Sequence, residues 1–297
     1  MEVKSVDPPA QERSSGPGQV DLLLPYNESC KTPANAFTEP SDHNRGDLDK
    51  GALEEKVRAK IASLTFGVAS RAKIEQDTRD QAGCQLWHKE RRDRIIESKF
   101  ASQFRRSPFP GELVKNILYP TTKFINRAMQ YGIDNEPLAI KDFERVYNKK
   151  VTRCGLFIHP AKGFLDASPD GLVNGEDAMV EVKCPQVAEN ITIEEAAENP
   201  QPGFCCDFMT GGLSLKTNHD YYYQIHGQLA ITSAKLCYFI VWCKRQIFVQ
   251  EIPYNEPLWK AMEAKLEKFY LNGMVLELVD PRALRNKPLR RSRNDTE

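Results

Sequence analysis

The stretch GFLDASPDGLVNGEDAMVEVKCP, which runs from Gly163 to Pro185, is the part of the chain around which the rest is organised. Its Asn174-Gly175 pair is the strongest short-range signal for a β-hairpin. Upstream of that pair, Ser168-Pro169-Asp170-Gly171 permits a sharp change of direction. Downstream of it, Met179 to Lys183 alternates apolar and charged residues, which is the period of a strand. The stretch therefore predicts two short strands joined by a tight turn.

The charged residues of the second strand are predicted to share one face. Side chains two positions apart point the same way in a strand, so Glu181 and Lys183 lie together. Val180 and Val182 then point into a core. A strand on the protein surface would give the same alternation. Asp170 favours the first interpretation, because the hairpin carries it back toward Glu181 from eleven positions upstream.

Two carboxylates and an ammonium at one place indicate a site for a hard cation. Mg²⁺ prefers a few carboxylate oxygens and keeps positions open for water and phosphate. Such a site can neutralise phosphate charge, and a nearby lysine can orient a water or accept its proton. Pro-Asp, a spacer and Glu-X-Lys form the signature of PD-(D/E)XK nucleases. We expect Mg²⁺ as the cofactor, with Mn²⁺ able to substitute for it.

Length and composition indicate one soluble domain. A chain of 297 residues can bury one sizeable core. Lys plus Arg and Asp plus Glu both number 41, so any DNA-binding surface must come from local clustering of charge. The 8 cysteines are scattered, and no apolar run resembles a signal peptide or a membrane span. We expect an intracellular protein with reduced thiols, and a nuclear location is compatible with a eukaryotic source.

The chain before the hairpin contains a tail and a helical extension. Residues 1–46 are rich in Pro, Ser, Asn and Gly without a sustained period, so we expect a disordered or loosely ordered tail. Residues 47–84 are expected to be helical, because apolar residues recur at helical spacing from Leu48 to Leu64. The segment from Phe100 to Pro110 is expected to be a loop.

Two segments between residues 85 and 150 carry candidate site residues. The basic run from Gln85 to Ser98 includes Arg91, whose planar guanidinium suits phosphate oxygens, and ends in a hydroxyl. An exposed charged helix explains the same run. Asp134-Asn135-Glu136-Pro137 predicts a helix start, with the helix running to about Asn148. Glu136 then has an ordinary explanation, since acids favour helix N-termini.

The chain after the hairpin completes a mixed sheet with helices on its flanks. Residues 189–212 are expected to form an insertion or flap, and residues 281–297 a basic tail. A helix is predicted from Asp220 to Thr232, with Gln224 and Gln228 on one face, where they would either border a cleft or face solvent. The remaining expected elements are a strand at 156–159, a hairpin at 236–242 and 246–252, and a helix at 258–270.

The chain resembles the phage lambda-type exonuclease or YqaJ-like viral recombinase family. The matching motifs, in order, are Trp87, Arg91 and Ser98; Gly132 with Glu136-Pro137; Ser168-Pro169-Asp170-Gly171; Glu181-Val182-Lys183-Cys184-Pro185; and Tyr223-Gln224. Together they cover roughly Trp87 to Trp242, which places a nuclease domain at residues 85–280. The resemblance implies a restriction-endonuclease-like PD-(D/E)XK core, an α/β fold.

The resemblance also implies roles for individual residues. The metal ligands would be Asp170, Glu181 and the Val182 carbonyl; Lys183 would position or activate the attacking water; Glu136 and Gln224 would complete the catalytic pocket; Arg91 and Ser98 would bind the phosphate at the 5′ end of DNA. The sequence departs from the family at Ile96-Glu97, where Thr-Ala usually precedes the serine, and in the length of residues 189–212.

The resemblance implies a Mg²⁺-dependent 5′–3′ exonuclease that degrades one strand of linear duplex DNA for recombination or viral DNA processing. Its expected partners are duplex DNA ends and a single-strand annealing protein, and some members form trimeric rings. One rival is a structure-specific endonuclease of the same fold, such as a junction resolvase. The other is a catalytically idle DNA-binding scaffold. Retention of Asp170, Glu181 and Lys183 argues against the idle scaffold, which has no chemical reason to keep them.

Overall fold

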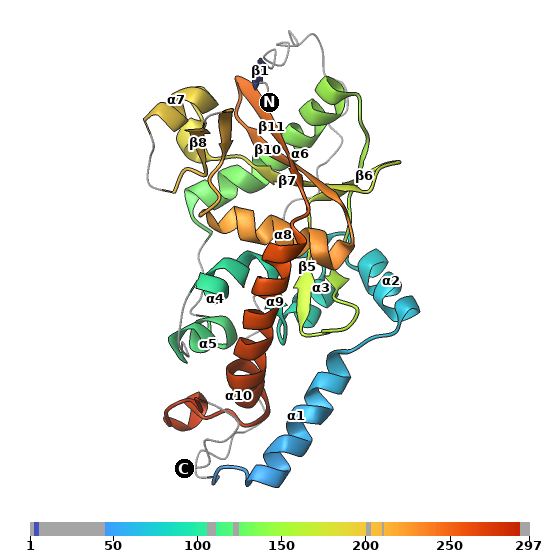
Figure 1. Ribbon diagram of the computed structural model, residues 1–297, viewed down its shortest axis with the longest axis vertical. Helices are drawn as coiled ribbons and strands as arrows, with labels where there is room; N and C mark the ends of the chain where they lie inside the picture. Colours follow the sequence, from blue (N-terminus) through green and yellow to red (C-terminus); the bar gives the residue numbers. More distant parts are fainter. Residues whose placement is uncertain are drawn as a thin grey trace, which may run out of the picture.

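A computed structural model of the chain describes residues 3–5, 45–105, 111–120, 125–199, 203–209 and 211–291. Its helices are α1 (Lys50–Leu64), α2 (Val68–Asp77), α3 (Gln85–Arg91), α4 (Phe100–Arg105), α5 (Gly111–Leu118), α6 (Arg127–Tyr147), α7 (Ile193–Glu198), α8 (Asp220–Thr232), α9 (Glu256–Phe269) and α10 (Val275–Val279). Its strands are β1 (Val3–Ser5), β2 (Ile95–Ile96), β3 (Val151–Thr152), β4 (Phe157–Ile158), β5 (Leu165–Ala167), β6 (Gly171–Val173), β7 (Ala178–Lys183), β8 (Cys206–Met209), β9 (Gly212–Leu215), β10 (Leu236–Trp242) and β11 (Gln246–Pro253). The main sheet occupies one end of an elongated molecule, and α1 and α10 lie at the other end (Figure 1).

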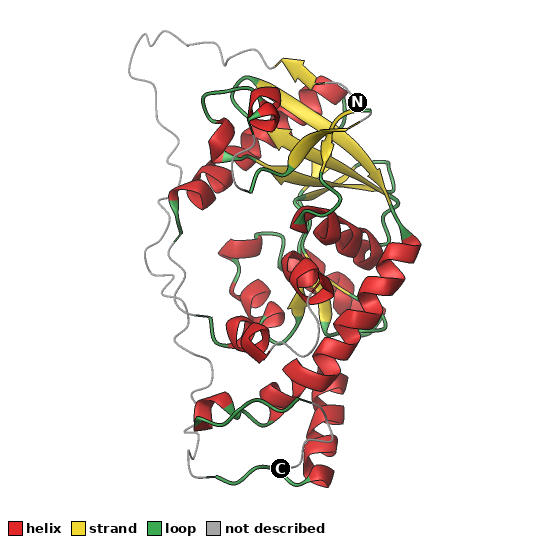
Figure 2. Cartoon of the chain, turned by 60° about the vertical axis from the view of Figure 1, so that its left-hand side comes forward, coloured by secondary structure: helices red, strands yellow, loops and turns green. Residues whose placement is uncertain are grey.

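The main sheet has six strands in the order β1-β11-β10-β7-β6-β3. The central pair, β7 and β10, is parallel, and every other neighbouring pair is antiparallel. The described strands also form two smaller sheets, β2-β5-β4 and β8-β9. Figure 2 shows most of the strands gathered at one end of the molecule, with helices around and below them. The predicted mixed sheet flanked by helices is confirmed.

Helices α6 and α8 cover opposite faces of the main sheet. On one face, Val180 and Val182 of β7 pack in a core with Ala139 and Phe143 of α6. On the other face, Met179 packs in a core that includes residues of α8. Because side chains alternate along a strand, Glu181 and Lys183 share the α8 side with Met179. The predicted inward direction of the two valines is confirmed.

The predicted hairpin is present as β6 and β7, which pair antiparallel. Gly175 has a φ of +79°, the left-handed region that the tight turn requires and that glycine adopts without a steric penalty. The segment upstream of the turn contains two strands where one was expected. Leu165–Ala167 forms β5 of the three-stranded sheet, and the chain changes direction at Pro169-Asp170 before it enters β6.

A third core holds the helical end of the molecule together. It contains buried apolar residues of α1, α4, α5, α9 and α10, with Phe164 stacked on Tyr270 at 4.4 Å between ring centroids. The helix expected from Leu48 to Leu64 is present and begins at Lys50, because the side chain of Asp49 accepts a hydrogen bond from the Ala52 amide at 2.9 Å and caps it. Among the described residues, no helix is both long and apolar enough to cross a bilayer.

Two predicted boundaries are wrong. Residues 100–105 form α4 where a loop was expected, because Phe100, Ala101 and Gln103 are buried against neighbouring elements; residues 106–110 lie outside the described ranges. Helix α6 begins at Arg127, well before the predicted start at Asp134, since Asn126 caps it by accepting from the Met129 amide. Pro137 therefore lies inside the helix.

The segments expected to be irregular contain ordered structure wherever they are described. Within 189–212, α7 begins with a capping box between Thr192 and Glu195 and buries Ile193, and β8 begins at Cys206. Strand β1 lies inside the expected N-terminal tail, of which residues 1–2 and 6–44 lie outside the described ranges. In the expected basic tail, Arg285 is buried and pairs with Asp280 at 2.8 Å.

Candidate active site

Glu181 and Lys183 lie side by side on β7, at the face of the sheet covered by α8. Glu181 is 1% exposed, and its carboxylate forms an ion pair with the Lys183 ammonium. That ammonium also lies 4.5 Å from the centre of the Tyr221 ring. Burial opposes the charge of Lys183, but Glu181 and Asp170 outweigh it and raise its pKa. The two residues that the sequence placed on one strand face are thus in contact.

Asp170 reaches the same place from the start of β6. Its Oδ2 atom accepts a hydrogen bond from the Val182 amide at 2.7 Å, which fixes the carboxylate beside β7. The next residue, Gly171, leaves no room for a side chain, because a Cβ there would lie 2.4 Å from Cγ1 of Val151. Burial raises the pKa of Asp170 well above its usual value, and the negative charge of Glu181 adds to the effect.

Two glutamines of α8 hold the Glu181 carboxylate from the opposite side. The Nε2 atom of Gln224 donates to Oε1 at 2.8 Å, and the Nε2 atom of Gln228 donates to Oε2 at 2.8 Å. Gln224 was a predicted site residue. Gln228 was not, although the sequence placed both glutamines on one helix face. The two residues are one helical turn apart, so a single helix supplies a donor to each oxygen.

Glu136 lies in the interior of α6, so the explanation of an acid at a helix N-terminus no longer applies. Burial raises its pKa, the Lys183 ammonium opposes that shift, and the Glu181 carboxylate adds to it. Glu136 is therefore close enough to Glu181 and Lys183 for their charges to act on it. Glu136, Asp170 and Glu181 therefore all interact electrostatically with Lys183.

Arg91 lies at the end of α3, and its environment differs from the expected one. Its guanidinium is 3.8 Å from the centre of the Trp87 ring and pairs with two acids, Glu97 at 3.6 Å and Asp166 at 3.9 Å. Ser98, the other predicted phosphate ligand, lies on the short 3-10 turn η2 (Glu97–Lys99) and is exposed. Sequence reasoning missed Asp166, whose only signal was its place four residues before Asp170.

The donor atoms of the site fit a hard divalent cation. The Asp170 and Glu181 carboxylates are buried close to each other, and the charge of Glu181 adds to the effect of burial in raising the pKa of Asp170. A bound cation would relieve this excess of negative charge. In the described part of the chain, no group of three or more His, Cys, Asp or Glu is arranged to hold a metal ion unaided. Two carboxylates with positions left for water and phosphate are the ligand set that Mg²⁺ commonly takes.

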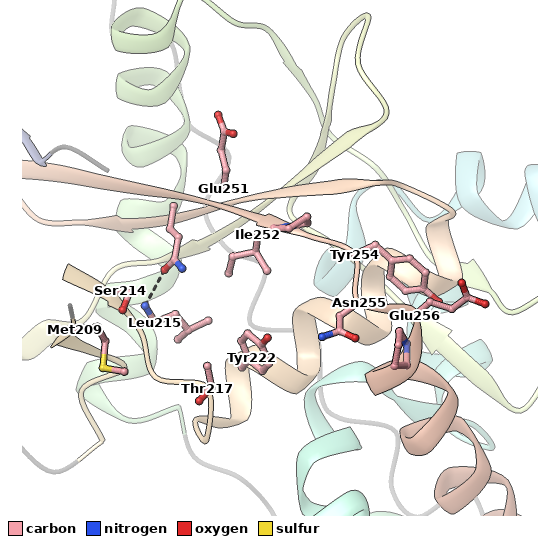
Figure 3. Close-up of a pocket in the computed structure, with 13 residues that line it drawn as sticks. Met209, Ser214, Leu215, Thr217, Tyr222, Glu251, Ile252, Tyr254, Asn255 and Glu256 are labelled. Carbon is pink, nitrogen blue, oxygen red and sulfur yellow. Dashed lines mark hydrogen bonds between the residues drawn. The ribbon is translucent and has the colours of Figure 1, made fainter. Parts of the chain in front are cut away.

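A separate groove of about 560 Å³ lies on another part of the molecule. Figure 3 shows Met209, Ser214 and Leu215 at one end of it, Tyr254, Asn255 and Glu256 at the other, and Tyr222 and Ile252 between them. The Leu215 amide donates to Oε1 of Gln250 at 2.7 Å at its edge. None of the predicted site residues lines this groove. The catalytic assignment therefore rests on the cluster at β7 and α8.

Structural comparison relates this chain to alkaline exonucleases. It is similar to LHK-Exo in complex with dAMP at 23% identity, over 66% of this chain and 96% of that one, with a TM-score of 0.50. LHK-Exo from Laribacter hongkongensis, described as an alkaline exonuclease, is 24% identical over 62% of this chain and 89% of that one, with a TM-score of 0.49. The Shutoff and Exonuclease Protein from Kaposi's sarcoma-associated herpesvirus is 11% identical over 69% of this chain and 72% of that one, with a TM-score of 0.47. The likeness to the dAMP complex shows that this chain has the alkaline exonuclease fold, of the PD-(D/E)XK type.

Sequence comparison gives the family. No curated protein is significantly similar to the chain in sequence. The YqaJ-like viral recombinase domain matches residues 86–235, just over half of the 297 residues. The matched segment includes the motifs from Trp87 to Gln224 on which the resemblance was based. The chain therefore belongs to the family of the YqaJ-like viral recombinase domain.

Proposed function

We propose that this chain is a metal-dependent nuclease that degrades one strand of linear duplex DNA from its 5′ end. The observation that carries the proposal is the convergence of Asp170, Glu181 and Lys183, with Gln224 and Gln228 bonded to both Glu181 oxygens. Membership of the family and the alkaline exonuclease fold support a nuclease acting on DNA. The site chemistry supports the metal, and the resemblance supports the 5′ direction.

Each residue of the cluster has a role in this reaction. The Asp170 and Glu181 carboxylates and the Val182 carbonyl would hold Mg²⁺, or Mn²⁺ in its place. When bound, the cation supplies charge neutralisation at the scissile phosphate. Lys183 would orient the attacking water. Glu136 would face that water from α6.

Gln224 acts through Glu181, because its amide fixes the carboxylate that would hold the cation. Arg91 and Ser98 would contact DNA phosphates. The proposed partners are duplex DNA ends and a single-strand annealing protein. By analogy with family members that form rings, the chain would form a homo-oligomer. An endonuclease of the same fold is the second candidate. It is favoured by the two acids beside Arg91, which weaken the attraction of that arginine for a terminal phosphate.

The test compares linear duplex DNA with covalently closed circular duplex, each incubated with Mg²⁺ or with EDTA. We expect Mg²⁺-dependent loss of the linear form alone. Asp170→Asn and Glu181→Gln should abolish that loss while DNA binding survives, since each removes a charge that the cation needs. Asp177→Asn is the matched control, because it makes the same change at a 70% exposed side chain of the same hairpin. Nicking of the circles would favour the endonuclease, and no metal-dependent cleavage of either form would overturn the proposal.

A further inference from the structure

Gln81 lies outside the matched YqaJ-like domain and contacts the turn before Asp170. It is half-buried and begins the short 3-10 turn η1 (Gln81–Gly83), between α2 and α3. Its backbone φ is +45°, in the left-handed region that a residue with a side chain rarely adopts. Such a conformation costs free energy and persists only where the surrounding structure holds it. Contacts with other parts of the chain must therefore hold Gln81 in place.

The side-chain amide of Gln81 joins two loops. Its Nε2 atom donates to the Cys154 carbonyl oxygen and to the Pro169 carbonyl oxygen, both at 2.9 Å. The Pro169 carbonyl belongs to the peptide group that leads into Asp170. The Sγ atom of Cys154 also donates to that carbonyl, at 3.2 Å, but a thiol is a weak donor. Gln81 therefore supplies the stronger hydrogen bond to the backbone immediately before a proposed metal ligand.

The end of α2, which leads into Gln81, is held against the first of these loops. The Oε1 atom of Glu75 accepts a hydrogen bond from the Gly155 amide at 3.0 Å. The Oγ1 atom of Thr78 accepts from the Leu156 amide at 2.8 Å. No residue of α2 itself is buried. Hydrogen bonds to the amides of the loop therefore help to hold the end of the helix, and with it the start of η1.

Asp170 is consequently held at both its side chain and its backbone. The Val182 amide donates to Oδ2 at 2.7 Å, which fixes the carboxylate beside β7. Gln81 holds the preceding peptide group, and rotation of that group changes φ of Asp170 and hence the direction of its side chain. Residues that orient a metal ligand affect metal binding strongly, and their loss commonly weakens it by about 10- to 100-fold. Gln81 is therefore placed to orient Asp170 from outside the hairpin.

We propose that Gln81 is a positioning residue, which sets the direction of Asp170 for metal binding by donating to the Pro169 carbonyl. This inference rests on the proposed function, since it takes Asp170 as a metal ligand. It gives a role in the active site to the chain before residue 86, which the family domain does not cover. The two hydrogen bonds made by the Gln81 amide offset the cost of its φ of +45°.

The test measures two metal constants. One is the affinity of the DNA-free protein for Mn²⁺ by isothermal titration calorimetry, and the other is the Mg²⁺ concentration that gives half-maximal cleavage of linear duplex DNA. Gln81→Met keeps the length of the side chain and removes the amide. We expect it to weaken Mn²⁺ binding by about tenfold or more and to raise the half-maximal Mg²⁺ concentration equally. Excess Mg²⁺ should restore most of the lost rate, because Asp170 is misdirected but still present.

Thr78→Val is the matched control for a general loosening of the contact between α2 and the loop. It removes the acceptor of the Leu156 amide but leaves the Pro169 carbonyl bonded to Gln81. We expect it to unfold at a lower urea concentration than wild type, with both metal constants unchanged. A loss of Mn²⁺ affinity equal to that of Gln81→Met would overturn the inference, because loosening alone would then explain both.

A second variant separates positioning from folding. Gln81→Gly also removes the amide, but glycine adopts a φ of +45° without strain. It should therefore unfold at no lower urea concentration than Gln81→Met and should bind Mn²⁺ as weakly. Wild-type cleavage with Mg²⁺, together with unchanged metal constants in both variants, would overturn this inference alone. Weakened Mn²⁺ binding in the variants without cleavage by wild type would overturn only the nuclease proposal, and a wild type that binds no Mn²⁺ would overturn both.

Discussion

Gln228→Met tests whether α8 organises the candidate site by holding Glu181. Methionine keeps the length of the side chain and removes the amide that donates to Oε2 of Glu181 at 2.8 Å. A hydrogen bond to a charged group contributes about 1.5–3 kcal/mol, which corresponds to about 10- to 100-fold in rate if it is fully expressed in the reaction. Gln228 is 0% exposed, and its Oε1 has no partner among the described residues. Removing that unpaired carbonyl offsets part of the lost bond, so we expect activity to fall further than stability.

The assay for Gln228→Met pairs single-turnover cleavage of linear duplex DNA with urea unfolding. The control is Gln103→Met in α4, where the glutamine is buried but neither amide atom has a partner among the described residues. That variant should keep its cleavage rate and should unfold at the same or a higher urea concentration, since no hydrogen bond is lost. Cleavage by Gln228→Met within about threefold of wild type would refute the reasoning. A rate loss shared equally with Gln103→Met would refute it as well.

Three further predictions concern other parts of the molecule. Glu136→Gln should lower kcat by about tenfold or more with little change in KM, since Glu136 would act on the water and not on DNA affinity; a matching loss of thermal stability would instead favour a packing role. Gly163→Ala should destabilise the fold by about 1–3 kcal/mol in urea unfolding, because the new Cβ would lie 2.1 Å from the Leu64 carbonyl oxygen, whereas Gly67→Ala meets nothing within 4 Å and should be close to neutral. Burial lowers the pKa of His226 to about 4, so the unfolded chain binds that proton first, and wild type should lose up to about 3 kcal/mol relative to His226→Leu as the pH falls from 6.5 to 4. Parallel stability curves for those two proteins would contradict this account.

The parts of the fold that the sequence predicts well are those whose signals are local. The Asn174-Gly175 turn needs a residue that adopts positive φ, and Gly175 has a φ of +79°. The helix predicted from Asp220 to Thr232 is α8 with the same bounds. The hairpin predicted after it is present as β10 and β11. In each case the spacing of apolar residues and the turn chemistry reflect contacts within one element or one hairpin.

The predicted start of α6 was wrong because Pro137 is compatible both with a first helical turn and with the interior of a helix. Pro137 is typical of a first helical turn, where its missing amide costs nothing. Inside a helix the same proline leaves the carbonyl four residues earlier without its partner, and that carbonyl belongs to Ile133. Ile133 is 56% exposed, so water can satisfy it, and the helix continues through the proline. The stronger start signal was Asn126, which caps Met129.

The residues that sequence reasoning missed depend on contacts between distant elements. Gln228 was on the correct helix face, but the sequence could not say whether that face met β7 or solvent. Glu97 was noted only as a departure from a family pattern, and Asp166 carried no signal beyond its place four residues before Asp170. Glu97 and Asp166 both contact Arg91, although they lie about 70 positions apart in the chain. No periodicity within one segment encodes such a contact.

Local signals and contacts between distant elements place different residues of the proposed site. Asp170, Glu181 and Lys183 come from one hairpin, and the Val182 amide of that hairpin fixes the Asp170 carboxylate at 2.7 Å. These three proposed catalytic residues are therefore placed by local geometry, which a short motif can specify. Arg91 is placed by tertiary packing, so its acid neighbours can change while the hairpin stays intact.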